Sequence, residues 1–556
     1  MQLLRGTKGE EALRALLKGA KALPAIALDP PSLEGETARV AAIATPDDAL
    51  LLDIQGIASL GELLAGQGVL AAANAKKHHR ALLRTFDQGP ARWACVQLSE
   101  VLIAGGRPVD LSLPAISARY DLPEPPSPDD GLNSLGHYAQ HIAQVVAAQI
   151  PRIQELNLTQ VSRLEAAAVA PVAEMEHRGM CLDAPGWRDL ARKAQLERDD
   201  LKARLHKFLS AHINHDLFGG AALNLDSNAE LLKVLRAMGH PLPNVKKESL
   251  QTLPEPFGPW LLRYREVSKL TSTYGESFLA TLGPDQRLHP TFEQIGANTG
   301  RMACHSPNLQ AVVKTSHHRD CFRCAPHRRV VVADYATCEL RILAHMSRDP
   351  VFLNAFAKGE DLHATVASTL WNTPVSKTQN PELRHRAKAV NFGLVYGMGP
   401  GGLAKNLKIS SQQALNLLED YFRTFPKIRD FLNSNAEVAL KRGYAETLTG
   451  RRLYLDGSGS ESERAQAERV AKNMPIQGSS ADMTKLALAD VRRRLLRFKD
   501  AWLVNAVHDE LVVECDAKDA EAVAEELRGA MVHAGQTLLP SIPIEVDVGV
   551  GHTWSK

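Results

Sequence analysis

Residues 384–397 read RHRAKAVNFGLVYG, and charged and aromatic side chains recur in this segment with a period of four. The repeating positions are Arg384, Lys388, Phe392 and Tyr396. On an α-helix each step of four residues drifts by only about 40°, so these side chains share one side over roughly 18 Å. The segment therefore predicts a helix, expected over residues 382–396, with two cations followed by two aromatic rings on one face.

This order of side chains suits a nucleotide that lies along the helix. The triphosphate would contact Arg384 and Lys388, and the sugar and base would contact Phe392 and Tyr396. The alternative is a solvated basic turn followed by an aromatic stripe in the core. Core stripes usually contain aliphatic residues as well, and here the cations continue the aromatic line. We therefore favour nucleotide binding.

Two aspartates that follow apolar segments are candidate metal ligands. Asp334 follows a strand expected at residues 330–333, and Asp509 lies in a turn, expected at 508–510, between strands at 504–507 and 511–514. Taken singly, each also fits a structural role as a helix cap or a turn residue. If the hairpin lies beside the first strand, the two carboxylates can hold two Mg²⁺ ions about 3.5–4 Å apart, as in-line phosphoryl transfer requires.

Composition limits the class of protein. The chain has 556 residues, enough for two or three domains, and its net charge is only +2. Any DNA-binding surface must therefore come from local clusters of Arg and Lys. No apolar run reaches the roughly 18 residues that suggest a membrane span, and the first 23 residues lack a secretory signal. Seven scattered cysteines fit reduced thiols, so we expect a cytoplasmic protein.

The segments along the chain predict at least two units. Strand-like segments at residues 25–28, 40–43 and 49–52 alternate with helical ones and indicate an α/β domain. A stretch rich in Pro at residues 122–132 is expected to be a loop or linker. Helical periodicity follows over 156–210 and 220–290, and strands and helices alternate from residue 291 onward.

Together these motifs resemble those of family A DNA polymerases, the family of bacterial DNA polymerase I. Asp334-Tyr335 with Glu339-Leu340-Arg341 resembles motif A, residues 384–397 resemble motif B, and Val507-His508-Asp509-Glu510 resembles motif C. Matching segments flank them at residues 269–274, 299–301, 307–310, 361–363, 448–452 and 473–478. The resemblance covers residues 170–556, in the order and spacing of the family.

The resemblance implies a fold of two parts. An α/β exonuclease-like domain of the ribonuclease H type would occupy residues 1–155. An α+β right-hand polymerase domain would occupy 156–556, with the thumb at about 185–290, the palm at about 291–350 and 477–556, and the fingers at about 351–476. The family's 5′-nuclease domain is expected to have no counterpart.

The resemblance also implies which residues bind metal and nucleotide. Asp334 and Asp509 would hold the two metals, the backbone carbonyl of Tyr335 would assist, and Glu510 would be an auxiliary acid close by. The triphosphate would be bound by Arg384, Lys388 and His363, and Lys388 can supply a proton to the departing pyrophosphate.

Other matching residues would select and align the substrates. Glu339 would be a steric gate that fills the space of a ribose 2′-hydroxyl, although an acid in the first turn of a helix also has a plain electrostatic explanation. Tyr396 would pair with Glu339 and close over the template base. Phe392, in place of Tyr, implies discrimination against dideoxynucleotides. The residues expected to follow the primer terminus and its minor groove are Arg301, Asn473, Gln477 and His508.

Motif A departs from the family pattern after Asp-Tyr. Ala336-Thr337-Cys338 replaces the usual Ser-Gln-Ile, and Thr337 is too short to make the polar contact of the usual Gln. The segment 321–324, with Cys321 and Cys324, and the nearby His317, His318 and His327 also suggest a zinc site. A strand of the palm is the interpretation we favour for this segment.

The exonuclease-like domain resembles its family without the residues that bind metal. Asp29 matches the first acid, but Pro31, His78 and Ile142 stand where the other three acids are expected. One carboxylate cannot hold two divalent ions, so no proofreading is expected. The alternative is a wrong register, with Glu34, Asp47 or Asp53 serving instead.

The sequence therefore predicts a DNA-templated DNA polymerase that uses two Mg²⁺ ions, for which Mn²⁺ can substitute. Its partners would be primer-template DNA and dNTPs, without a membrane, and it would act as a monomer. One alternative is a bifunctional polymerase with an active 3′–5′ exonuclease. Another is a non-catalytic DNA-binding protein, but binding alone does not require paired aspartates.

Overall fold

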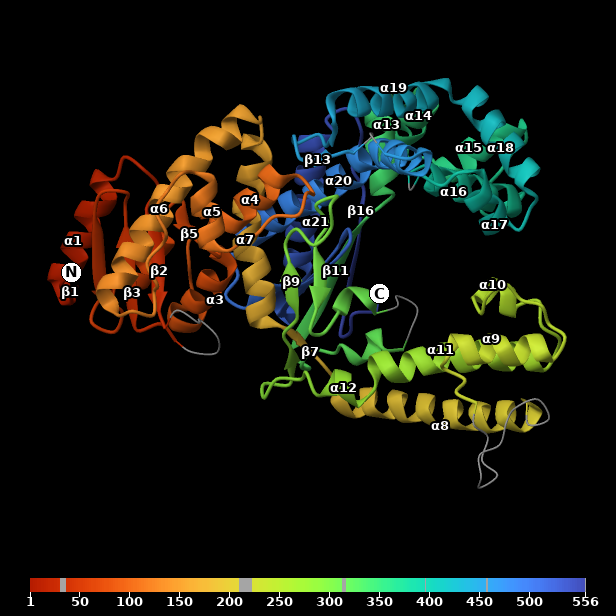
Figure 1. The fold of residues 1–556 in the computed structure, drawn as a ribbon, viewed down its shortest axis with the longest axis horizontal. Helices are drawn as coiled ribbons and strands as arrows, with labels where there is room; N and C mark the ends of the chain where they lie inside the picture. The colour runs from red at the N-terminus through yellow and green to blue at the C-terminus, as the bar shows by residue number, and fades with distance from the viewer. Residues whose placement is uncertain (31–36, 210–222, 313–316, 396, 457–458, 556) are drawn as a thin grey trace.

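The structure is a computed structural model that describes residues 1–30, 37–209, 223–312, 317–395, 397–456 and 459–555. Figure 1 shows an α/β unit at one end and a central sheet beside it. A group of helices extends from the centre above, and a long helical arm extends below, so that the two face each other across an open space. No helix in these ranges is both long enough and apolar enough to cross a membrane.

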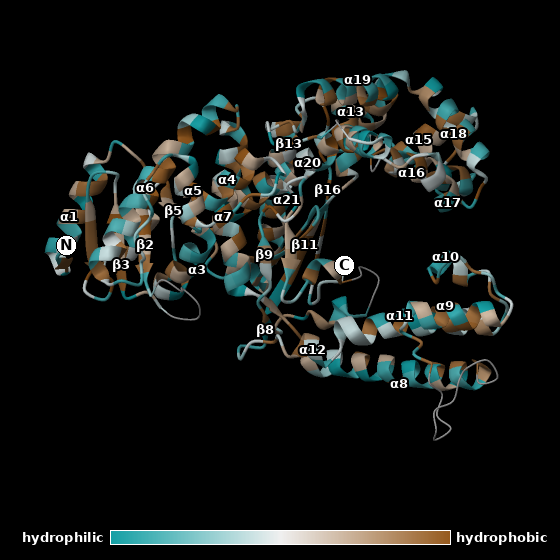
Figure 2. Cartoon of the chain, in the orientation of Figure 1, coloured by the Kyte–Doolittle hydropathy of each residue, from teal (hydrophilic) through white to brown (hydrophobic). Residues whose placement is uncertain are grey.

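The amino-terminal unit is built on a six-stranded mixed sheet. The strands, in spatial order, are β1 (Leu3–Leu4), β4 (Ala49–Asp53), β3 (Val40–Ala44), β2 (Ala25–Asp29), β5 (Leu70–Ala72) and β6 (Trp93–Cys95). The sequence correctly predicted β2, β3 and β4. These strands are nearly continuous in apolar residues because helices cover both faces, and Figure 2 shows them mainly in brown.

Helices pack on the two faces of this sheet. Helix α6 (Leu132–Glu155) covers one face, and α1 (Gly6–Gly19) and α3 (Ala75–Phe86) cover the other. The remaining helices of the unit are α2 (Leu60–Ala65), α4 (Val96–Ala104) and α5 (Leu113–Arg119). The expected loop at residues 122–132 lies between α5 and α6 and is mostly free of regular structure.

Helix α7 (Thr159–Arg178) joins this unit to the rest of the chain. Val169 packs into the core of the amino-terminal unit, whereas Val172 and Met175 belong to the main core of the rest of the chain. Two buried acids on α7, Glu165 and Glu176, form ion pairs with basic side chains of other segments. Glu176 accepts contacts from Lys76 at 2.6 Å and Arg80 at 3.1 Å, both on α3.

The central sheet is antiparallel and has the strand order β14-β15-β11-β16. Its strands are β11 (Arg328–Tyr335), β14 (Ala501–Val507), β15 (Glu510–Asp516) and β16 (Val546–Gly551). Helices α20 (Glu461–Leu495) and α21 (Ala520–Leu538) pack on one face. Residue 510 was expected in the turn between β14 and β15, but it begins β15, because Glu510 pairs with both Val507 and Asp334.

The upper helices follow directly from β11. They are α13 (Cys338–Ser347), α14 (Pro350–Ala357), α15 (Leu362–Trp371), α16 (Pro381–Val395), α17 (Pro400–Leu407), α18 (Ser411–Thr424) and α19 (Pro426–Arg442). Side-chain caps start several of them, as at Asp349 and Asp361, and Ser410 forms a capping box with Gln413. The palm boundary expected at residue 477 falls inside the continuous helix α20.

The lower arm is a pair of long helices with its own core. Helix α8 (Ala184–Leu209) lies beside α11 (Phe257–Tyr274), and α9 (Asn228–Ala237) and α10 (Lys247–Leu250) complete the arm. Leucines such as Leu205, Leu231 and Leu261 fill the space between them. Short elements join the arm to the sheet: β7 (Met180–Cys181), α12 (Glu276–Leu279), β8 (Arg287–Leu288), β9 (Thr291–Glu293) and β10 (Ala303–His305).

The second buried acid of α7, Glu165, binds cations from two distant segments. Its carboxylate contacts Lys485 on α20 at 2.6 Å and Arg451, which lies beside β13 (Arg452–Tyr454), the partner of β12 (Tyr444–Glu446). Burial and, to a lesser extent, the neighbouring positive charge of Arg451 lower the pKa of Lys485 to about 8, although the carboxylate of Glu165 acts to raise it. The cluster therefore depends on the negative charge of Glu165.

Replacing Glu165 by Gln should destabilise the protein by about 3 kcal/mol, because it leaves the buried Lys485 without its counter-ion and Arg451 with Asp482 alone. The measurement is thermal and urea unfolding followed by circular dichroism. Glu155→Gln is the control, since Glu155 pairs with Arg152 on the surface and its loss should cost less than about 1 kcal/mol. Equal melting of the two variants would contradict this account.

Candidate active site

The two predicted metal ligands lie at one edge of the central sheet. Asp334 is the next-to-last residue of β11, and Asp509 is in the two-residue turn between β14 and β15. The backbone amide of Tyr335 donates to the carbonyl of Asp509 at 3.4 Å. Both aspartates are half-buried. The structure therefore brings together the backbones of two aspartates that are 175 positions apart in the chain.

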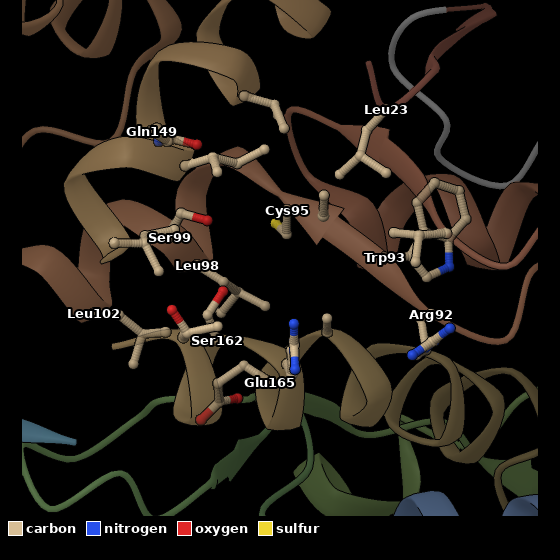
Figure 3. A pocket seen from close by; sticks show the side chains of 18 of the residues that line it. Leu23, Arg92, Trp93, Cys95, Leu98, Ser99, Leu102, Gln149, Ser162 and Glu165 are labelled. Atoms are coloured by element: carbon tan, nitrogen blue, oxygen red, sulfur yellow. The ribbon is translucent and has the colours of Figure 1, made fainter. Parts of the chain in front are cut away.

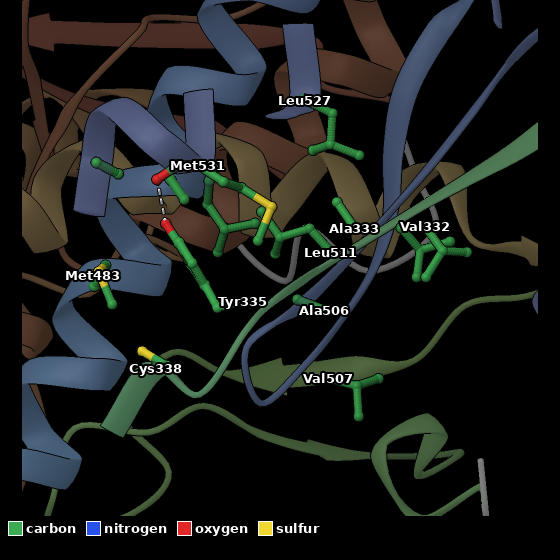
Figure 4. Packing of buried hydrophobic residues seen from close by; sticks show 14 of the residues in the cluster. Val332, Ala333, Tyr335, Cys338, Met483, Ala506, Val507, Leu511, Leu527 and Met531 are labelled. Carbon is green, nitrogen blue, oxygen red and sulfur yellow. Dashed lines mark hydrogen bonds between the residues drawn. The ribbon is translucent and has the colours of Figure 1, made fainter. Parts of the chain in front are cut away.

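Buried contacts hold the end of β11 in place. The hydroxyl of Tyr335 donates to the carbonyl of Met531 on α21 at 2.7 Å, as Figure 4 shows. Ala333 and Leu511 are fully buried on the same side. Since neighbouring side chains alternate between the faces of a strand, this anchors Tyr335 toward α21 and places Asp334 on the opposite face.

A further carboxylate, Asp547, lies beside Asp334. It is on β16, directly opposite Asp334 in the ladder, and it is exposed. Directly paired residues of an antiparallel ladder share a face, with Cβ atoms about 4.5–5.5 Å apart. The sequence analysis missed Asp547, because nothing in the sequence indicates that residues 334 and 547 are on neighbouring strands.

The oxygen donors of Asp334 and Asp509 suit Mg²⁺. This ion takes one or two carboxylates from a protein and completes its coordination with water and substrate phosphates. The described residues contain no group of three or more His, Cys, Asp or Glu arranged to hold a metal ion. The site therefore fits Mg²⁺ bound jointly with a substrate better than an ion enclosed by protein.

Glu339, the predicted steric gate, is buried in the first turn of α13. Its carboxylate accepts a hydrogen bond from the guanidinium of Arg301. Arg301 in turn lines a small cavity together with His508, one of the other residues expected at the primer terminus. The structure thus joins the expected gate to the expected primer-binding residues.

Helix α16 carries the predicted nucleotide-binding side chains. Lys388 is exposed, and its Nζ lies 5.8 Å from the centre of the half-buried ring of Phe392. One turn earlier, Arg384 contacts the carboxylate of Asp361 at 2.7 Å. Burial raises the pKa of Asp361, but Arg384 outweighs this and holds the pKa below its ordinary value. Tyr396 lies outside the described residues.

His363 lies against the same helix. Its Nδ1 is 3.1 Å from Nδ2 of Asn391, and its ring centre is 5.6 Å from that of Phe392. Burial lowers the pKa of His363 to about 4, so the ring is neutral near pH 7. The sequence analysis missed Asn391, whose Oδ1 accepts a hydrogen bond from the hydroxyl of Tyr421. The sequence signal that could have identified Asn391 is a polar residue on the buried side of the predicted helix.

The remaining residues expected at the primer lie on α20 and in the β14–β15 turn. Nε2 of Gln477 donates to the carbonyl of Val395 at 3.4 Å. Asn473 is buried, and its Oδ1 has no hydrogen-bond partner among the described residues. A side chain at Gly397, where φ is +65°, would put its Cβ 2.2 Å from Nδ2 of Asn473, so this position requires glycine. His508 also has a left-handed backbone, with φ of +57°.

The motif A departure coincides with an unusual backbone conformation. Thr337 has φ of +53° and ψ of 42° at the start of α13. β-Branched residues rarely adopt this region. The neighbouring Cys338 is buried, and its Sγ lies 3.3 Å from the hydroxyl of Ser480.

The residues at the expected exonuclease positions do not form a group of acids. Asp29 ends β2 and pairs with Arg39 at 3.3 Å. His78 is buried, with Nδ1 2.8 Å from the carbonyl of Asn74, and burial lowers its pKa to about 4. Ile142 is fully buried in α6. Pro31 and the alternative acid Glu34 lie outside the described residues.

The cysteines considered for zinc are buried thiols. Burial raises the pKa of Cys321 to about 11 and also raises that of Cys324. Cys324 Sγ donates to the carbonyl of Arg328 at 3.1 Å. His317 is exposed and instead lies 3.4 Å from Asp320.

A separate pocket of about 370 Å³ lies between the amino-terminal unit and α7. Figure 3 shows it lined by Trp93, Cys95 and Leu98 on one side and by Ser162 and Glu165 on the other. None of the predicted polymerase or metal-binding residues lines this pocket, so it is not part of the candidate active site.

Comparison with known proteins identifies relatives of the chain. DNA polymerase I of Chloroflexus aurantiacus is 36% identical over 415 residues, which cover 71% of this chain and 43% of that protein. The thermostable DNA polymerase I of Thermus aquaticus is 35% identical over 405 residues, or 69% of this chain and 47% of that protein. The chain therefore spans about half the length of these curated relatives.

A solved structure matches the whole chain. It is described as the POL domain of Pol1 from M. smegmatis in complex with DNA primer-template and dNTP, and it has a TM-score of 0.85 and 29% sequence identity. The match covers 100% of this chain and 99% of that one. The sequence model of DNA polymerase family A matches residues 193–556, well over half of the chain. This chain belongs to DNA polymerase family A.

Proposed function

We propose that the protein is a DNA-templated DNA polymerase, which extends a primer 3′-end with dNTPs by a two-metal mechanism. The observation that carries the proposal is the meeting of Asp334 and Asp509 at the edge of the sheet. The similar solved structure, which contains primer-template and dNTP, supports the proposed substrates. A protein that only bound DNA would not need the paired aspartates.

Each group of side chains has a proposed task in this reaction. Two Mg²⁺ ions on Asp334 and Asp509, with the carbonyl of Tyr335, would activate the primer 3′-hydroxyl and neutralise the departing pyrophosphate. Lys388 and Arg384 would bind the triphosphate, with His363 contributing as a neutral ring. Arg384 now pairs with Asp361, so it must exchange a carboxylate for a phosphate when the nucleotide arrives.

Glu339 is proposed to select the sugar. It is buried and held by Arg301, so it cannot move aside freely when a 2′-hydroxyl occupies its space. Tyr396 is proposed to close over the template base, and Asn473, Gln477 and His508 to contact the primer terminus. Arg301 thus has a double task, because it holds the gate and lies beside His508.

We also propose that the amino-terminal unit, of the ribonuclease H type, has no exonuclease activity. The alternative acid Asp53 pairs with Arg5 at 2.7 Å, and Asp47 is exposed. Asp29 lies on β2 and Asp53 on β4, with β3 between them, and Asp29 already pairs with Arg39 at 3.3 Å.

The cellular setting is proposed on similar grounds. All seven cysteines are free, which supports a reducing cytoplasm. The proposed partners are primer-template DNA and dNTPs, and the protein is proposed to act as a monomer.

The central test is the replacement of Asp509 by Asn. Extension of a labelled primer with dNTPs and Mg²⁺ should fall by at least about 10³-fold, the scale expected when a metal ligand at the reacting atoms is lost. Primer-template binding should be retained. Asp516→Asn is the matched control, because Asp516 ends β15, the strand that follows Asp509, and pairs with Arg328. Near-normal extension by Asp509→Asn would refute the metal role.

Two substitutions of Glu339 separate steric from electrostatic selection. Glu339→Ala should improve ribonucleotide use relative to dNTPs by at least about tenfold, because it removes the volume that excludes a 2′-hydroxyl. Glu339→Gln keeps the volume and loses only the charge, and its amide oxygen can still accept a hydrogen bond from Arg301, so discrimination should stay largely intact. Single-nucleotide incorporation kinetics give both values. If Gln relaxed selectivity as much as Ala, exclusion by volume would be wrong.

The exonuclease proposal is tested with primer-template and Mg²⁺ in the absence of dNTPs. We expect no shortening of a labelled 3′-end, and Asp29→Ala should behave like the unaltered protein. Shortening that disappears in Asp29→Ala would show that the domain is an active proofreading nuclease.

A further inference from the structure

Glu510, which directly follows Asp509, is tied into a buried ion pair. Only 3% of its side chain is exposed. Its Oε1 accepts from Nη1 of Arg319 at 3.0 Å and from the indole Nε1 of Trp554 at 2.8 Å. The same Nη1 lies 3.3 Å from Oε2. We refer to Arg319, Glu510 and Trp554 as the Glu510 clamp.

The clamp joins three separate segments. Arg319 lies in the short 3₁₀ helix η3 (Arg319–Cys321), and Trp554 lies in an extended segment that pairs with residues 322–324. The amide of Trp554 donates to the carbonyl of Phe322 at 3.0 Å. The guanidinium of Arg319 lies 3.9 Å from the centre of the fully buried indole of Trp554. Trp554 therefore holds both members of the ion pair, Glu510 through its N–H and Arg319 through its ring face.

Because Glu510 lies next to the proposed metal ligands, the clamp can affect the active site. Glu510 pairs with Asp334 across the β11–β15 ladder, so both side chains are on the same face of the sheet. Asp547 already lies beside Asp334 on this face, and a further ionised carboxylate would repel the aspartates and compete with them for cations. Arg319 neutralises Glu510, and two donors fix its Oε1. Arg319 and Trp554 thus hold the carboxylate in place.

We infer that Arg319 and Trp554 are positioning residues that hold Glu510 out of the metal site and fix the turn carrying Asp509. This rests on the proposed two-metal function and deepens it, because it assigns Glu510 a role other than that of an auxiliary acid. The clamp keeps the number of carboxylates facing the metals low. It also anchors β15 at its first residue, one position from Asp509.

The first test is Trp554→Phe, which retains a ring over Arg319 and removes the N–H bonded to Glu510. Loosening the carboxylate should lower kcat by about threefold to tenfold, the effect of losing one hydrogen bond to a charged group. The half-saturating Mg²⁺ concentration should fall at least about threefold, because a released carboxylate adds an oxygen ligand. Primer-template affinity should stay within about twofold, since the three clamp side chains are buried and have no surface for direct contact with DNA.

A matched control separates this role from stability alone. Trp93 is also fully buried, and its Nε1 donates to Nδ1 of His79 at 2.9 Å in the amino-terminal unit. Trp93→Phe loses an equivalent bond far from the metals, so it should leave the Mg²⁺ requirement unchanged. Arg319→Lys keeps the charge but not the planar guanidinium, and it should shift the Mg²⁺ requirement in the same direction as Trp554→Phe.

The decisive measurement is a double-mutant cycle with Glu510→Gln, which removes the charge that the clamp controls. When Trp554→Phe is added to the Glu510→Gln variant, it should change the half-saturating Mg²⁺ concentration by less than about twofold. Equal shifts with and without Glu510→Gln, or no shift with Glu510 present, would overturn the inference. Failure of the unaltered protein to extend a primer would instead refute the proposed polymerase function.

Discussion

The antiparallel register of β11 and β15 is the constraint on which the active site depends. It sets Asp334 opposite Glu510 and leaves Asp509 in a turn of two residues. Because a shift of one residue would turn every side chain to the other face, the buried valines of both strands and the proposed metal-binding edge are fixed together. Helix α21 covers one face of the sheet, and Asp334 lies on the opposite face.

Buried charge pairs fix the elements around this sheet. Arg328 and Arg287 both bind Glu514, which lies on β15 four residues after Glu510. All three side chains are largely buried. Such pairs contribute little net stability, because desolvation offsets their attraction. They do penalise any arrangement in which one partner is left alone. The long arm and the upper helices attach to the sheet separately. The penalty therefore favours one relative placement of the segments next to Asp334 and Asp509.

The amino-terminal unit uses its helix α3 to bind the rest of the molecule. Lys76 and Arg80 lie on either side of the buried His78 and pair with Glu176 on α7. His79 on the same helix is within 3.6 Å of Glu174, and Glu174 binds Arg492 of α20 at 2.7 Å. The segment that resembles a metal-binding motif is thus part of an interdomain contact. This supports a structural task for the unit in the absence of the full set of acids.

The sequence by itself determined the parts that are local. The period of four in residues 384–397 predicted α16, the apolar runs predicted β11, β14 and β15, and the motifs indicated the family. It did not determine which carboxylates meet, because strand pairing joins residues 175 or more positions apart. Only the tertiary structure placed Asp547 beside Asp334, Arg301 on Glu339, and Glu510 between Arg319 and Trp554. Helix and strand propensities act over a few residues, whereas these contacts exist only after distant segments have packed together.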